Sequence, residues 1–236
     1  MLTYHPYTIF PLGDTALTIE FSNIIDREIN KKVLTLFRQL GEANIPYITD
    51  LVPGYSSLTV HYRVSALHRQ DATAFEVMAE MIENLTEEMA SPEQQASRFF
   101  EVPVCYDEKF APDLKEVIQN RKLSKEEIIS LHTEKPYHIY MLGFLPGFPY
   151  MGEVDEKLRM PRREPRKVMA GSIGITGMQT GIYPFETPGG WQVIGRTPLP
   201  IFNKEWTQPT LFAPGDTVKF FSITSDEFED YQRRNS

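Results

Sequence analysis

The chain has 236 residues, of which 41% are hydrophobic and 24% charged, the balance of a globular protein with one large or two modest domains. Its net charge of −8 argues against a general nucleic-acid binder, because such proteins usually carry a basic face. The single cysteine excludes an intrachain disulfide, and no apolar run approaches the roughly 20 residues that span a bilayer, so we expect a cytoplasmic protein.

The first third of the chain alternates strand and helix patterns. Residues 15–21 alternate apolar and polar side chains, as a half-buried strand does, and apolar residues recur at helical spacing over 26–40. The predicted elements are strands at 15–21, 45–51 and 57–62 and helices at 26–40 and 71–89. We therefore predict a small α/β domain over residues 1–95, of βαββαβ type, with two helices on one face of its sheet and a polar linker at 91–97.

The remaining residues, 96–236, are typical of a second domain built from short strands. Residues 99–106 form a strand that either completes the first sheet or begins this domain. Two helices follow within 107–135, and the second opens with the capping-box spacing of Ser124 and Glu127. Further strands are predicted at 137–142, 173–176, 180–183, 191–195, 211–212 and 217–222. Dense turn signals between short strands favour a barrel or sandwich, and the polar tail after residue 224 is predicted to fray.

Glycine and proline concentrate in one segment of this second domain. Ten of the 14 glycines lie between Gly143 and Gly195. Glycine permits backbone conformations and close approaches that a Cβ forbids, so the segment indicates a shaped surface. Gly171, Gly174 and Gly177 recur every third residue without forming a dinucleotide fingerprint, and no P-loop is present. This spacing favours close packing of a strand edge over a phosphate cradle.

The titratable residues give no definite catalytic set. The five histidines show no metal-ligand spacing, so we predict no dedicated metal site. His132 ends a predicted helix, where a cation meets the negative end of the helix dipole, and this role is favoured over general acid or base work. The apolar run VPVCY predicts that Cys105 is a small buried side chain rather than a nucleophile.

A basic loop at 159–167 reverses the sign of the chain's charge locally. It contains four arginines and one lysine against one acid, Glu164, and Pro161 and Pro165 stiffen it. The guanidinium fork suits carboxylate or phosphate groups, and a stiff loop loses less entropy when an anion docks. A solvated charged loop is the alternative. Aromatic side chains and two glutamines in the glycine-rich segment indicate either a pocket for a small polar ligand or ordinary core packing.

Several motifs together identify a resemblance. LGFLPGFPYMG, PRREPR, AGSIGITGMQTGIYP, PGGWQVIGRTP and APGDTVKF occur in this order, and the similarity runs from FPLGDTALTIEF at residue 10 to the PGD turn at 214–216. The chain is similar to the allophanate hydrolase subunit 1 family. The B components of ATP-dependent 5-oxoprolinases and Kip-type inhibitors of a sporulation kinase belong to this family.

The resemblance implies a fold and a function. It implies an α+β N-terminal domain followed by an all-β, cyclophilin-like barrel. It also implies a heteromeric hydrolase that converts 5-oxo-L-proline to L-glutamate and hydrolyses ATP. ATP is then a substrate, either alone or as its Mg complex. The implied partners are the C component of 5-oxoprolinase, which is a second cyclophilin-like chain, and its A component, which is of lactam-utilisation type. The alternatives are an inhibitor of a sensor histidine kinase and a chain related to allophanate hydrolase or urea amidolyase. Neither nucleic acid nor membrane is an expected partner.

The resemblance also places a substrate- or anion-binding site, although it assigns no chemical role to any residue in it. The catalytic residues are therefore unknown, and the candidates are His132, Arg162 and Gln179. The expected site residues are Gly143, Phe144, Pro146, Gly147, Phe148, Arg162, Arg166, Gly171, Gln179, Gly181, Tyr183, Trp191 and Arg196.

Overall fold

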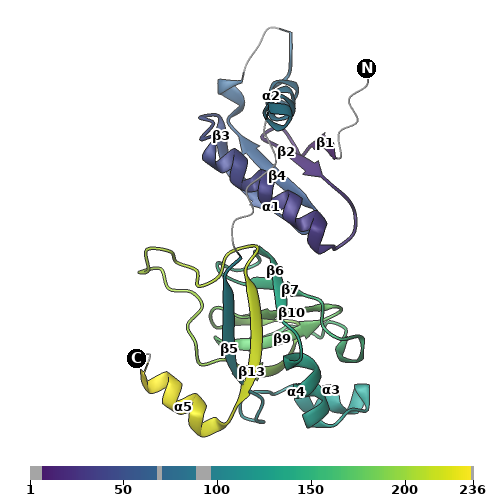
Figure 1. Ribbon diagram of the computed structural model, residues 1–236, viewed down its shortest axis with the longest axis vertical. Helices are drawn as coiled ribbons and strands as arrows, with labels where there is room; N and C mark the ends of the chain where they lie inside the picture. The colour runs from purple at the N-terminus through teal and green to yellow at the C-terminus, as the bar shows by residue number, and fades with distance from the viewer. Residues whose placement is uncertain (1–6, 68–70, 89–96, 235–236) are drawn as a thin grey trace. The chain divides into compact units, whose positions relative to one another are not determined.

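The computed structural model describes residues 7–67, 71–88 and 97–234, and the chain divides into two compact units, 1–96 and 97–236 (Figure 1). The boundary expected from sequence, at 95 and 96, lies one residue from this division. The segment expected as a linker lies outside the described residues except for Ser97. Within the described residues, no helix is long and apolar enough to cross a membrane.

The N-terminal unit is an antiparallel sheet with two helices packed on its apolar side. The strand order is β1-β2-β4-β3. The elements are β1 (Thr8–Pro11), β2 (Ala16–Glu20), α1 (Arg27–Glu42), β3 (Ile48–Pro53), β4 (Ser57–Tyr62), a 3₁₀ turn (Val64–Ala66) and α2 (Ala74–Glu88). Leu17 and Ile19 of β2 share one core with Val33 of α1 and Met78 of α2, as the period of two in a strand requires.

The order of elements in this unit differs from the prediction. Strand β1 was not predicted, and it makes the observed order ββαββα rather than βαββαβ. It is a short edge strand that carries a proline and is largely exposed, so it has little apolar alternation to detect. Strand β5, at 99–105, belongs to the second unit, which decides between the two assignments left open above.

The C-terminal unit is a closed barrel of seven strands in the order β10-β7-β6-β13-β5-β12-β9. Its strands are β5 (Phe99–Cys105), β6 (Tyr137–Leu142), β7 (Pro149–Gly152), β9 (Ser172–Thr176), β10 (Gln179–Ile182), β12 (Gln192–Arg196) and β13 (Thr217–Ile223). Outside it lie α3 (Leu114–Arg121), α4 (Lys125–Thr133), a 3₁₀ turn (Glu156–Leu158), the hairpin strands β8 (Arg166–Val168) and β11 (Thr187–Gly189), and α5 (Ser225–Arg234). The predicted α+β domain followed by a barrel is confirmed.

The polar tail is a helix and does not fray as predicted. Helix α5 begins with a capping box, in which the Thr224 N–H donates to Glu227 Oε2 at 2.8 Å and the Glu227 N–H donates to Thr224 Oγ1 at 3.3 Å. Phe228 is 1% exposed, and its ring centroid lies 4.1 Å from that of Phe110. The predicted strand at 211–212 was also wrong, because only an isolated bridge joins Phe202 and Thr210 there.

The first and last strands of the barrel lie side by side. Strand β13 pairs in parallel with β5 along its whole length, from Thr217 opposite Phe99 to Ile223 opposite Cys105 (Figure 1). Cys105 is fully buried, as predicted, and burial raises the pKa of its thiol. The first residues of β5 are therefore fixed by their position next to the final strand.

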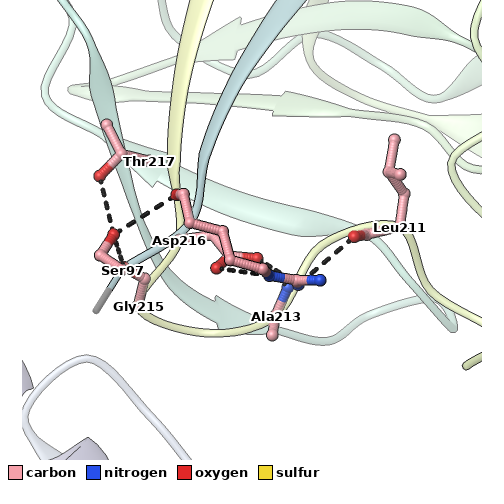
Figure 2. A network of polar contacts seen from close by, with 7 residues as sticks. Ser97, Leu211, Ala213, Gly215, Asp216 and Thr217 are labelled. Atoms are coloured by element: carbon pink, nitrogen blue, oxygen red, sulfur yellow. Dashed lines mark hydrogen bonds and ion pairs between the residues drawn. The ribbon is translucent and has the colours of Figure 1, made fainter. Parts of the chain in front are cut away.

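A polar network anchors the start of this unit (Figure 2). Arg98 donates to both carboxylate oxygens of Asp216, at 3.1 and 2.5 Å, and the Ala213 N–H donates to the same carboxylate at 2.7 Å. The hydroxyl of Ser97 donates to the carbonyl of Gly215 at 2.7 Å. Asp216 is 4% exposed, so these donors satisfy a carboxylate that would be costly to bury alone. The turn at 213–217 thus holds the first residues of the barrel.

Candidate functional site

A second, smaller core lies on the outer face of the barrel. Ile173 and Ile175 of β9 point into the interior core, so Gly174 between them faces outward. Phe148, Tyr183 and other side chains pack over this outer face. The members of this outer cluster are Phe148, Val168, Tyr183, Trp191 and Val193, with Leu145 and Tyr150 beside them.

Glycines make room for the rings of the outer cluster. A Cβ on Gly181 would lie 2.7 Å from Cζ of Phe148, and a Cβ on Gly174 would lie 2.9 Å from Cβ of Trp191. Phe148 and Tyr183 are each 1% exposed and Trp191 is 4% exposed. Most of the aromatic rings are therefore packed against one another, which favours the core-packing alternative over a pocket lined by all of them.

The three glycines spaced by three do not share one role. Gly174 lies under the outer cluster, but Gly171 precedes β9 with a φ of 79°, and a Cβ there would lie 2.4 Å from the Thr197 carbonyl oxygen. Gly177, with a φ of 51°, lies in the turn between β9 and β10. Close packing and turn formation explain these positions, and only one of them lies within a strand.

The loop at 143–148 braces itself with main-chain hydrogen bonds. The Leu145 N–H donates to the Gly143 carbonyl at 2.7 Å, a γ-turn around Phe144, whose φ is 64°. The Phe148 N–H donates to the Leu145 carbonyl at 3.0 Å across Pro146 and Gly147, and the φ of 81° at Gly147 fits a type II turn. The loop therefore has one backbone shape, set by its own sequence.

This loop presents one aromatic ring to solvent. Phe144 is 64% exposed, and its ring makes a T-shaped contact with that of Phe148, at 5.9 Å between centroids. A positive φ is unfavourable for a phenylalanine, and an exposed ring contributes little to folding. Phe144 therefore combines backbone strain with exposure, and this combination favours a role in contacting another molecule.

The basic loop at 159–167 is largely neutralised by acids from other parts of the chain. Four of its five cations form ion pairs: Arg159 with Glu156 at 3.7 Å, Arg163 with Asp113 at 3.0 Å, Lys167 with Glu186 at 2.9 Å, and Arg166 with Asp113. Of the two alternatives left open above, neither describes the whole loop, because most of its cations are already paired within the chain. Arg166, an expected site residue, forms an ion pair with Asp113.

Asp113 is the residue of this region that sequence reasoning missed. Its carboxylate is completely buried and accepts from Arg163, from Arg166 and from the Val193 N–H at 2.7 Å. Asp113 stands at the N-cap of α3, yet its side chain makes no capping hydrogen bond to that helix. An aspartate directly before a helix predicts a hydrogen bond to the first N–H groups of that helix. The sequence pattern therefore indicates a helix cap rather than the arginines that Asp113 binds.

Arg162 differs from its neighbours in the basic loop. It is exposed and makes no ion pair or hydrogen bond within the described residues. Burial raises the pKa of Tyr150 and Tyr183, and the positive charge of Arg162 acts in the opposite direction on both. Arg162 therefore lies close enough to the outer cluster for its charge to act on both phenols, and those phenols stay protonated at neutral pH.

The other expected site residues divide between this surface and other places. Gln179 is half-buried at the start of β10. Gly147 packs against Phe202 and Thr210. Arg196 donates from Nε to the Ala170 carbonyl at 2.7 Å and lies over the ring of Phe228, so it belongs with α5 rather than with the outer cluster.

His132 is an interior residue, and its predicted cationic role at the helix end was wrong. It is completely buried, and burial lowers its pKa to about 3, so the ring is neutral at physiological pH. The Thr180 hydroxyl donates to the Gly174 carbonyl, so it accepts from His132 Nε2 at 3.2 Å, and Nδ1 accepts from the Tyr106 hydroxyl at 2.7 Å. Both ring nitrogens of His132 are thus hydrogen-bonded in the interior, which disfavours contact between His132 and a substrate.

Comparisons with known proteins place the chain among characterised relatives. The model of a family described as carboxyltransferase domain, subdomain C and D, matches residues 7–212. The chain is 39% identical over 236 residues to the B subunit of 5-oxoprolinase from Bacillus subtilis, covering 98% of each chain. It is 38% identical to the B subunit of 5-oxoprolinase from Escherichia coli O157:H7, covering 89% of this chain and 93% of that protein.

A solved structure shares the fold. The urea amidolyase of K. lactis superposes with a TM-score of 0.75 over 97% of this chain at 19% identity, and this chain spans 15% of that protein. At this identity the likeness concerns the fold alone.

Proposed function

Because the chain belongs to the carboxyltransferase-domain family, subdomain C and D, we propose that it is the B component of an ATP-dependent 5-oxoprolinase. The resemblance drawn from its motifs is confirmed by the same matches. The observation that carries the proposal is the identity of 39% to the Bacillus subtilis protein over nearly the whole of both chains. The kinase-inhibitor role stays a prediction from the resemblance.

The proposed reaction opens the lactam ring of 5-oxo-L-proline to L-glutamate while ATP is hydrolysed. Amide resonance makes the lactam carbonyl a poor electrophile, so the coupling to ATP supplies the activation. We propose that this chain contributes a binding surface rather than a complete active site. The proposed surface consists of Phe144, Tyr150, Arg162 and Gln179 beside the outer cluster.

The chain lacks the sequence motif of an ATP site of its own. It has no P-loop, and its glycine triplet is used in packing and turns. We therefore propose that ATP, with its Mg, binds mainly to a partner chain. The proposed partners are a second chain with a related barrel and a chain of lactam-utilisation type. The relatives are named as subunits of a larger enzyme, which supports a multi-chain assembly.

The test is reconstitution. The chain is purified with its two proposed partners, and ATP hydrolysis is followed with and without 5-oxo-L-proline. We expect 5-oxoproline-dependent release of phosphate together with glutamate, and loss of both when this chain is left out. A complex that assembles fully, as judged by size-exclusion chromatography, but shows no dependence on 5-oxoproline would overturn the proposal.

A further inference from the structure

The distribution of charge around the basic loop restricts what it can bind. Three acids, Glu156, Asp113 and Glu186, take up four of its five cations, and Asp113 serves two arginines at once. Arg162 alone has no partner in the described chain and is exposed. The loop therefore offers one uncommitted guanidinium group rather than a field of positive charge.

We infer that Arg162 binds the carboxylate of the substrate and that Asp113 is the positioning residue that holds Arg162 in place. The inference rests on the proposed function for the identity of the acid, 5-oxo-L-proline, but its charge argument applies to any small monocarboxylate. A guanidinium fork matches one carboxylate with two parallel hydrogen bonds. Tyr150 lies within the electrostatic reach of Arg162, which places the guanidinium beside the outer cluster.

The same charge count disfavours a polyphosphate. A nucleotide triphosphate carries several negative charges, which proteins usually meet with a backbone cradle, a lysine and a metal ion. Within the described residues, the loop has a single unpaired cation, and Gly171 and Gly174 are closely packed against Thr197 and Trp191. The surface therefore suits a ligand with one negative charge.

Asp113 acts on Arg162 through its neighbours in the chain. It binds Arg163, which follows Arg162 directly, and Arg166, three residues further on. Its own position is fixed by paired main-chain contacts, because its N–H donates to the Val193 carbonyl at 3.0 Å and its carboxylate accepts from the Val193 N–H. The Arg163 N–H also donates to the Gly190 carbonyl at 2.9 Å. These contacts fix the main chain next to Arg162, whose own side chain is exposed and unpaired within the described residues.

The first experiment measures KM for 5-oxo-L-proline and for ATP in the assembled complex. Arg162→Gln should raise KM for 5-oxoproline by about ten- to one-hundredfold, as expected for losing a charged hydrogen-bonding pair, and leave KM for ATP unchanged. Asp113→Asn should raise the same KM several-fold, and Asp113→Glu should restore part of it. Asp107→Asn and Lys204→Gln are the matched controls, because they remove an acid and a cation elsewhere in the unit.

The pattern separates positioning from simple structural support. If Asp113 only stabilised the fold, Asp113→Asn would lower kcat through loss of active complex and leave KM for 5-oxoproline as in the wild type. That result would overturn the positioning role. An unchanged KM in a folded Arg162→Gln complex would overturn the binding role, and the proposed function would stand.

The second experiment is independent of turnover. The full chain, labelled with ¹⁵N, is titrated with 5-oxo-L-proline, with 2-pyrrolidone and with Mg-ATP while the side-chain Nε–H signal of Arg162 is observed. 2-Pyrrolidone has the same lactam ring without the carboxylate. We expect only 5-oxoproline to shift the signal. An equal shift with 2-pyrrolidone or Mg-ATP, or no shift with 5-oxoproline, would overturn the inference. An inactive wild-type complex that still gives the expected shift would reject the proposed function alone.

Discussion

The two loops on the outer side of the barrel are made rigid in different ways. The loop at 143–148 is held by hydrogen bonds between its own main-chain groups, including one from the Gly143 N–H to the Phe148 carbonyl at 3.1 Å. The basic loop at 159–167 is held by Asp113, a side chain about fifty residues earlier in the chain. The shape of the first loop is set largely by main-chain hydrogen bonds among its own residues. The second loop is held by groups outside it, of which the buried Asp113 carboxylate binds two of its arginines.

The largest expected effect tests that single carboxylate. Asp113→Asn leaves the guanidinium of Arg163, which is 9% exposed, without its counter-charge, so we expect a loss of about 3–5 kcal/mol in the free energy of unfolding of the C-terminal unit. Urea denaturation followed by tryptophan fluorescence measures it, because both tryptophans lie in this unit. A loss below about 1 kcal/mol would mean that other contacts hold the basic loop.

A smaller effect tests the self-braced loop. In Gly147→Ala, an alanine would have to adopt a φ of 81°, and its Cβ would lie 3.2 Å from the ring of Phe202. We therefore expect a loss of about 1–2 kcal/mol in the free energy of unfolding. Gly41→Ala is the control: Gly41 lies in α1 with nothing within 4 Å of an added Cβ, and the change should stabilise by up to about 1 kcal/mol. Thermal denaturation followed by circular dichroism compares the two variants. Equal effects would contradict the local origin of the loop's rigidity.

A still smaller effect concerns the exposed ring of the same loop. Phe144→Asn removes a 64% exposed ring and places at a φ of 64° a residue that tolerates it, so stability should stay level or rise by up to about 1 kcal/mol. Thermal denaturation gives the sign. A clear loss of stability would show that the edge contact with Phe148 supports the fold and would weaken the case for Phe144 as a contact residue.

The smallest effect compares the buried acid with an exposed one. Asp107 is 45% exposed, and hydrogen bonds from Ser225 and then Lys125 lower its pKa to about 2. Because the pKa of Asp107 is lower in the folded chain, its carboxylate stabilises the fold at pH values above the pKa in the unfolded chain, which is about 4. This stabilisation is lost as the pH falls through the folded pKa of about 2. Solvent screening keeps it below about 1 kcal/mol. The stability difference between wild type and Asp107→Asn should therefore be small at pH 5 and vanish towards pH 2.

The two loops also show how far sequence reasoning reaches. The loop at 143–148 is predictable in principle, because Pro146 and Gly147 specify a type II turn by themselves. The ion pairs of the basic loop are not, because nothing near Asp113 distinguishes it from a helix cap. The prediction of a cationic role for His132 was wrong for the same reason. Its position at the end of α4 was predicted correctly, but it is enclosed by Phe220 of β13 and Thr180 of β10, which are distant in sequence.

The strands divide in a similar way. Strands β6, β9, β10, β12 and β13 were predicted within a residue or so, because their apolar positions are clear. Strands β7, β8 and β11 have three or four residues, and two of them contain a proline, so they carry too little pattern to detect. Helix α5 was not predicted, although the spacing of Thr224 and Glu227, which cap it, is visible in the sequence.

The parallel pairing of β5 with β13 has a consequence for how the protein is made. Strand β13 lies between β5 and β6, so the gap that it fills stays open until residues 217–223 have left the ribosome. Synthesis proceeds at roughly 5–20 residues per second, and during that time the edges of β5 and β6 lack their neighbour. A nascent chain that stops before residue 217 would leave these two edges unpaired and prone to aggregate.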